Sequence, residues 1–179
     1  MNRDAEPPKT ATFESPNAPR VPPPPDMRPE IVIHTQDDDD RAWLQVADNA
    51  WVRPLMFNPM MGTWTDIMRA EGAQVLNRHH HATPVTAYTL EGAWGYLEHD
   101  WVATPGTFVT EPAGETHTLI VHPSAGHMKA IFHNWGPFID VDDEGNVIAV
   151  SDVFTRLEIF REHYRNNGLG EAFLDNLIR

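Results

Sequence analysis

The chain has 179 residues, a length that suits one domain with a sizeable core. Its 26 acidic and 13 basic residues give a formal net charge of −13, which disfavours phosphate backbones and anionic membranes, so neither nucleic acid nor membrane is an expected partner. Since there is no cysteine, disulfides and thiolate metal sites are excluded, and any metal must take nitrogen and oxygen ligands.

Residues 1–30 hold nine of the 16 prolines, including the run Pro22–Pro25. Such a segment builds neither regular helix nor sheet, so we expect it to be extended or disordered. It lacks the apolar core of a signal peptide, and no apolar run in the chain approaches the roughly 20 residues that span a bilayer, which together predict a cytoplasmic protein. The acidic run Asp37–Asp40 is interpreted as a solvated loop, because its spacing matches no calcium loop.

Residues 31–150 are predicted to form an all-β domain. Short apolar or alternating runs follow one another and are separated by turn residues such as those in Glu91-Gly92 and Glu144-Gly145. The predicted strands are Trp51–Met56, Thr63–Arg69, Ala73–His79, Val85–Leu90, Trp94–His99, Gly106–Glu111, Thr118–His122, Met128–Trp135, Phe138–Val141 and Val147–Val150. Many short strands at this spacing indicate a sandwich or barrel.

Residues 151–179 change to helical spacing. Val153, Leu157, Phe160 and Tyr164 recur on one helix face after Asp152, a residue suited to an N-cap. Gly168 is placed to end this helix, and a shorter apolar face follows it, formed by Phe173, Leu174, Leu177 and Ile178. We expect these helices to pack on the barrel or on a second subunit.

Three histidines carry the chemical signal. His79 and His81 alternate along a predicted strand, so their side chains point to the same face and that of His80 points away. His117 ends the pattern Gly106-x5-Pro112-x-Gly114-x2-His117, whose turn residues bring a later strand back beside the first. Three imidazoles meeting in this way hold a divalent metal and leave coordination positions open for chemistry.

At these residues the chain resembles the cupin superfamily. The pattern ending at His117 fits the second cupin motif, and the segment from Gly72 to Gly95 resembles the first. The resemblance implies a double-stranded β-helix, or jelly-roll barrel, with metal ligands His79, His81 and His117. Many cupins carry a glutamate ligand four residues after the second histidine. Val85 stands at that position, so a site of three histidines is implied.

Glu98 is the candidate for a substitute carboxylate. In a strand over Trp94–His99, the side chains of Trp94, Tyr96 and Glu98 share one face. If that face lines the barrel, Glu98 reaches the metal or the surroundings of its ligands. The alternative is that Glu98 lies on the barrel rim and binds water.

Several longer segments resemble the 2,4'-dihydroxyacetophenone dioxygenase family. They are Asp37–Asp40, Arg41-Ala42-Trp43, His79-His80-His81, Tyr88-Thr89-Leu90-Glu91-Gly92, Gly95–Trp101 and Glu111–Thr118. The resemblance implies an Fe(II)-dependent dioxygenase that cleaves this aryl α-hydroxyketone with O2 to give 4-hydroxybenzoate and formate. Glu98 then completes the resting metal site or accepts the proton lost when the hydroxyketone enolises. Histidine-rich sites also accept zinc, nickel, copper and manganese.

Other functions remain open at this point. The barrel also suits β-diketone cleavage, an oxygen-independent isomerisation, a non-catalytic metal-binding sensor or a storage protein. Trp94, Tyr96, Phe108 and Trp135 are candidates to line an aryl-binding cavity, although most aromatics in a small barrel fill its core. The Pro-rich segment and the C-terminal helices suit a homo-oligomer, as a dimer or tetramer.

Overall fold

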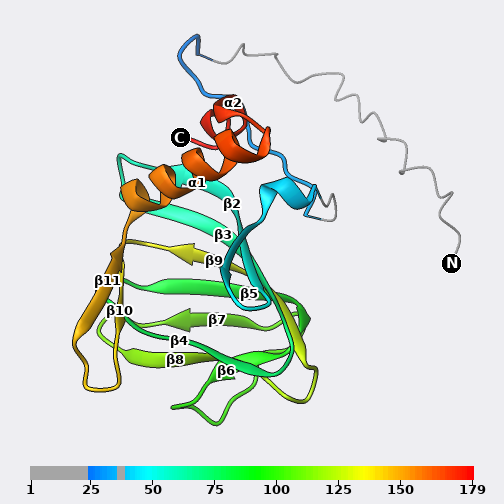
Figure 1. Ribbon diagram of the computed structural model, residues 1–179. Coiled ribbons are helices and arrows are strands. Elements are labelled where there is room, and N and C mark those ends of the chain that lie inside the picture. Colours follow the sequence, from blue (N-terminus) through cyan, green and yellow to red (C-terminus); the bar gives the residue numbers. More distant parts are fainter. Residues whose placement is uncertain (1–23, 36–38) are drawn as a thin grey trace, which may run out of the picture.

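A computed structural model describes residues 24–35 and 39–179, and two antiparallel sheets form its body (Figure 1). Six strands pair in the order β1-β2-β3-β9-β5-β7 and five in the order β11-β10-β4-β8-β6. The strands are β1 (Leu44–Ala47), β2 (Ala50–Asn58), β3 (Thr63–Glu71), β4 (Gln74–His81), β5 (Val85–Gly92), β6 (Trp94–Tyr96), β7 (Phe108–Glu111), β8 (Thr116–Val121), β9 (His127–Asn134), β10 (Phe138–Val141) and β11 (Val147–Ser151). This architecture confirms the predicted jelly-roll barrel.

Every strand predicted from Trp51 to Val150 is present, with ends shifted by at most three residues. The largest shift concerns β6, which ends at Tyr96 instead of continuing to His99, because the chain turns there and His99 N–H donates to the Tyr96 carbonyl. The sequence analysis missed β1 and the short 3-10 helix η1 (Asp40–Ala42). Most of the Pro-rich segment 1–30, predicted to be extended or disordered, lies outside the described residues. So do Asp37 and Asp38 of the predicted solvated loop.

The C-terminal helices α1 (Val153–Asn167) and α2 (Glu171–Asp175) lie across one end of the sandwich (Figure 1). The Asp152 side chain caps α1 by accepting from the backbone N–H groups of Phe154 and Thr155, and Gly168 ends it with a φ of 82°. The four predicted apolar residues of α1 are buried against Phe57 and Trp64 of the six-stranded sheet. The helices therefore pack on the barrel, the first of the two expected arrangements.

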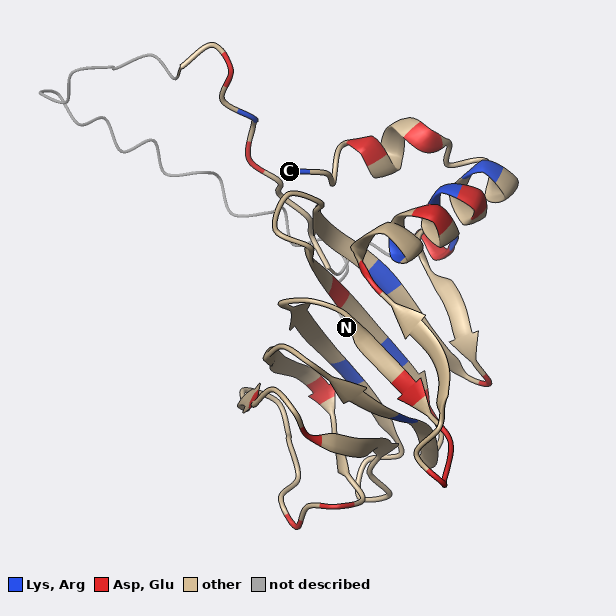
Figure 2. Ribbon diagram, turned by 90° about the vertical axis from the view of Figure 1, so that its left-hand side faces the viewer, with Lys and Arg blue, Asp and Glu red and all other residues tan. Residues whose placement is uncertain are grey.

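A second apolar cluster fills the interior between the sheets and includes Trp94, Tyr96, Leu119 and Met128. Acidic residues lie at strand ends and in loops around the sandwich, while α1 carries both signs of charge (Figure 2). Within the described part of the chain, no helix combines the length and the apolar character needed to span a membrane.

Candidate metal centre

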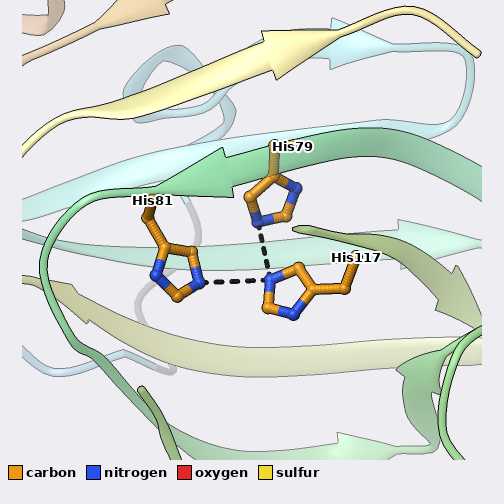
Figure 3. A group of neighbouring side chains, drawn as sticks. All are labelled: His79, His81 and His117. Atoms are coloured by element: carbon orange, nitrogen blue, oxygen red, sulfur yellow. Dashed lines mark hydrogen bonds between the residues drawn. The ribbon is translucent and has the colours of Figure 1, made fainter. Parts of the chain in front are cut away.

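Neighbouring strands bring the three predicted histidines together. His79 and His81 lie on β4, His117 lies on β8, and His79 is the direct cross-strand partner of His117. The side chains of all three converge between the sheets, as Figure 3 shows. His80 is not part of this group, and its Nδ1 lies 3.5 Å from Thr116 Oγ1. The predicted alternation along the strand is thereby confirmed.

The convergence is through the Nε2 atoms. His117 Nε2 lies 3.2 Å from His79 Nε2 and 3.2 Å from His81 Nε2. His81 and His117 are fully buried, and His79 is partly buried. Ligand nitrogens about 2.1 Å from a shared metal stand roughly 3.0 Å apart at octahedral angles and roughly 3.4 Å apart at tetrahedral angles. The observed separation lies between these two, so the spacing fits a single ion.

A carboxylate that is not among the predicted site residues lies beside two of the histidines. Glu111, at the end of β7, is buried, and its Oε2 lies 3.1 Å from His81 Nε2 and 3.6 Å from His117 Nε2. Its Oε1 accepts a hydrogen bond of 2.7 Å from the Tyr96 hydroxyl. Two signals in the sequence pointed to it: Glu111 directly precedes Pro112 of the second motif, and it shares strand parity with the half-buried Val109.

The atoms that face one another in this group include more hydrogen-bond acceptors than donors. His81 Nδ1 lies 2.9 Å from the Thr83 carbonyl, which can only accept, so Nδ1 is the donor. In the neutral ring, Nε2 of His81 is then an acceptor that faces the Glu111 carboxylate and His117 Nε2, two further acceptors unless they carry protons. A divalent cation removes this conflict, because all of these atoms can be its ligands.

The electrostatic environment also lowers the pKa values of His79 and His117. Burial, with a smaller opposing effect of Glu111, lowers the pKa of His79 to about 4. Burial and the neighbouring His79 and His81 lower the pKa of His117 to about 3. Neutral imidazole is the form that coordinates metals, so both rings are ready to bind at neutral pH.

The Tyr96 ring holds His117 in place by stacking on it, with centroids 3.6 Å apart and the planes inclined by 6°. Glu115 Oε2 lies 3.9 Å from His117 Nδ1, too far for a hydrogen bond, and Glu115 Oε1 pairs with His99 Nε2 at 2.8 Å. The stacking restricts the orientation of the His117 ring, as residues around a metal site commonly do.

Glu98 lies outside the histidine group, and its expected role as a metal ligand stays a prediction. Its two carboxylate oxygens accept from the backbone N–H of Thr118 at 2.7 Å and from Thr118 Oγ1 at 2.8 Å. The physical reason is the early end of β6: beyond Tyr96 the chain turns, so the two-residue alternation no longer holds at Glu98. Glu98 nevertheless lines the cavity beside the histidines.

His79, His81 and Glu111 line a cavity of about 930 Å³, whereas His117 is fully buried behind them. Of the four aromatics proposed to line it, only Tyr96 does so. Trp94 is in the core, whereas Phe108 and Trp135 are more than half exposed. The aromatic walls come instead from Phe132 and Phe138, and Val85 takes part in the lining. A cavity of this size holds a small aromatic molecule.

Solved structures that are similar to this chain include proteins with a cupin fold. An RmlC-like cupin protein from Ralstonia eutropha JMP134 matches with a TM-score of 0.67 and 29% identity, over 70% of this chain and 83% of that chain. An acetylacetone dioxygenase from Acinetobacter johnsonii matches with a TM-score of 0.63 and 17% identity, over 75% and 95%. A putative acetylacetone dioxygenase from Methylibium petroleiphilum PM1 matches with a TM-score of 0.61 and 19% identity, over 75% and 98%.

The similarity to these two proteins is below 20% sequence identity, so it supports the fold alone. No curated protein matches the sequence. The model of the ChrR Cupin-like domain matches residues 29–139, a stretch that contains both histidine motifs and more than half of the chain. The fold, the histidine geometry and this match lead to one conclusion: the chain belongs to the ChrR Cupin-like domain family.

Proposed function

We propose that this protein is an Fe(II)-dependent dioxygenase that cleaves a carbon–carbon bond of an aryl α-hydroxyketone. The observation that carries the proposal is the convergence of three imidazoles, with the buried Glu111 beside them, at the wall of a cavity of aromatic-substrate size. The sequence resemblance names 2,4'-dihydroxyacetophenone as the substrate. Cleavage between its carbonyl and hydroxymethyl carbons, with one oxygen atom of O2 entering each product, gives 4-hydroxybenzoate and formate.

His79, His81 and His117 would hold the metal, and Glu111 would hold it or a group bound beside it. When bound there, Fe(II) supplies a chelating centre for two oxygens on adjacent carbons and reactivity toward O2. Nitrogen ligands with one carboxylate and open positions are typical of non-haem iron enzymes, although zinc, nickel, copper and manganese also fit this donor set.

The protein's own groups would manage the proton and the solvent. Glu111 is the buried carboxylate nearest the histidines and is the candidate acceptor for the proton lost as the hydroxyketone enolises. The Tyr96 hydroxyl orients it through its hydrogen bond. Phe132 and Phe138 keep this part of the cavity apolar, which strengthens the electrostatic interactions inside it. Glu98, on the same cavity wall, stays a proposed second acceptor farther from the histidines.

Oxygen consumption tests this proposal. Protein loaded anaerobically with Fe(II) is expected to consume one O2 for each 4-hydroxybenzoate formed from 2,4'-dihydroxyacetophenone, and the H117A variant is expected to consume none. Iron-loaded wild-type protein that neither takes up O2 nor forms product with this substrate would overturn the substrate assignment.

A second candidate reaction is the cleavage of a β-diketone, favoured by the two structural neighbours whose names carry that activity. A β-diketone also presents two chelating oxygens and loses a proton on enolisation. Oxygen uptake with acetylacetone, and none with the hydroxyketone, would make this the function instead.

A further inference from the structure

The cavity has a second polar region, formed by residues far apart in the sequence. Asp66 on β3 and Arg156 on α1 line the same cavity as His79 and His81. Their side chains are about nine-tenths buried and form an ion pair, in which Arg156 Nη2 donates to Asp66 Oδ2. The indole Nε1 of Trp64 donates to the same Oδ2 at 3.0 Å.

This pair is incompletely satisfied. Asp66 Oδ1, an acceptor, and Arg156 Nε, a donor, are buried and have no hydrogen-bond partner among the described residues. A pair whose only task is to fasten α1 to β3 would be expected to use these atoms, because unpaired buried polar groups cost free energy. One acceptor and one donor of this cavity-lining pair are therefore left without a partner in the structure.

Aromatic rings separate this pair from the histidines. Between ring centroids, Phe138 lies 5.6 Å from His79 and 6.1 Å from Trp64. Trp64 in turn donates a hydrogen bond to Asp66. Phe138 also lines the cavity. An aryl ring packed on Phe138 would thus have the histidines toward one end and the Asp66–Arg156 pair toward the other.

The charges select the kind of group that fits. Asp66 and Arg156 neutralise each other, so the subsite offers no net charge to an ionic ligand. Three further acids, Asp140, Asp142 and Asp143, line the same cavity and disfavour anions. A hydroxyl is neutral and both donates and accepts, so it matches the unused acceptor and the unused donor at once.

We infer that Asp66 and Arg156 form a specificity subsite that recognises a neutral phenolic hydroxyl at the end of an aryl ligand remote from the histidines. The aryl ketone used to test it rests on the proposed function, whereas the hydroxyl recognition rests on the pair itself. Both residues are positioning groups for the ligand and take no part in bond cleavage.

Equilibrium binding tests this inference without turnover. The probes are 4'-hydroxyacetophenone, 4'-methoxyacetophenone and acetophenone, measured by calorimetry on zinc-loaded protein. Wild-type protein is expected to bind the phenol at least about tenfold more tightly than either of the others, as two satisfied hydrogen bonds imply. Equal binding of the three probes by the wild-type protein would overturn the inference.

Variants assign the effect to the pair. R156M, and the double variant D66N/R156M that leaves no unpaired buried charge, are expected to bind the three probes equally. R161M makes the same change on α1 at a residue that pairs with Glu171 outside the cavity, and it should keep the preference for the phenol. A preference retained in either pair variant that folds would contradict the assignment. Phenol selectivity without oxygen uptake would leave the subsite standing and reject only the proposed reaction.

Discussion

At the residue scale, the alternation of His79, His80 and His81 makes a sharp prediction about metal retention. H79A and H117A each remove one of three converging nitrogens, and we expect either variant to lose its metal on dialysis. H80A removes a ring outside the group and should keep a full equivalent. Metal content by mass spectrometry decides the matter, and equal losses in H79A and H80A would show that the strand register is wrong.

Two glutamates offer a second residue-scale comparison. E111Q removes the charge of the carboxylate that faces His81 and His117, so we expect zinc affinity to fall by about 10- to 100-fold in titration calorimetry. E98Q changes a carboxylate bound to Thr118 and should leave zinc affinity unchanged. If E98Q weakened zinc binding as much as E111Q, the ligand set drawn from the geometry would be wrong.

These residues also show how far the sequence can predict a site. The three histidines follow from spacing, because the two-residue strand period and the turn residues of the second motif are local properties. Glu98 was selected by extending that period past Tyr96, where the strand has already ended. Glu111 has only indirect signals in the sequence, its place before Pro112 and its strand parity, because its approach to the histidines depends on the pairing of β7 with β5.

At the scale of elements, α1 depends on its N-terminal cap. The Asp152 side chain accepts from two backbone N–H groups, and Thr155 Oγ1 accepts from the backbone N–H of Asp152. D152A should lower the free energy of unfolding by about 1 kcal/mol in urea denaturation. E158A, at an exposed position within the same helix, should change it by less than about 0.5 kcal/mol. Similar losses in the two variants would argue against the cap.

The elements that were predicted and those that were missed differ in burial. Buried strands such as β3 and β9 show clear apolar patterns, and α1 has both a cap and a periodic apolar face. In contrast, β1 is an edge strand of four residues that are mostly exposed, so it is too short and too little buried to give a clear apolar pattern. Its strand conformation is imposed by pairing with β2.

At the scale of the whole molecule, the buried histidines couple metal-free stability to pH. The folded-state pKa values of His79 and His117, about 4 and about 3, lie below the ordinary value of 6.5. The unfolded chain therefore binds more protons below pH 6.5, and stability falls as the pH drops from 6.5 toward 4. The loss approaches about 1.4 kcal/mol per pH unit for each histidine.

Urea denaturation of the metal-free protein across this pH range measures the effect. The variant H79Q/H117Q should show a shallower decline than the wild-type protein, since acidic groups elsewhere contribute equally to both. The same slope in both proteins would mean that these histidines are not kept neutral by the fold.

The cavity is likewise a property of the whole molecule. Its walls combine β4 with β3, the β10–β11 hairpin and α1. The helical pattern predicted α1 and its apolar face, but it contained no information on where Arg156 would dock. The convergence of the three histidines was thus predictable from the sequence, while the surroundings of the cavity required the tertiary structure.

Isotope labelling shows whether both atoms of O2 enter the products of hydroxyketone cleavage, as the proposed dioxygenase reaction requires. Fe(II)-loaded protein is supplied with 2,4'-dihydroxyacetophenone under ¹⁸O2, and the products are analysed by mass spectrometry. We predict one ¹⁸O atom in 4-hydroxybenzoate and one in formate. Cleavage products that carry no label from O2, or label in only one of the two, would contradict the account.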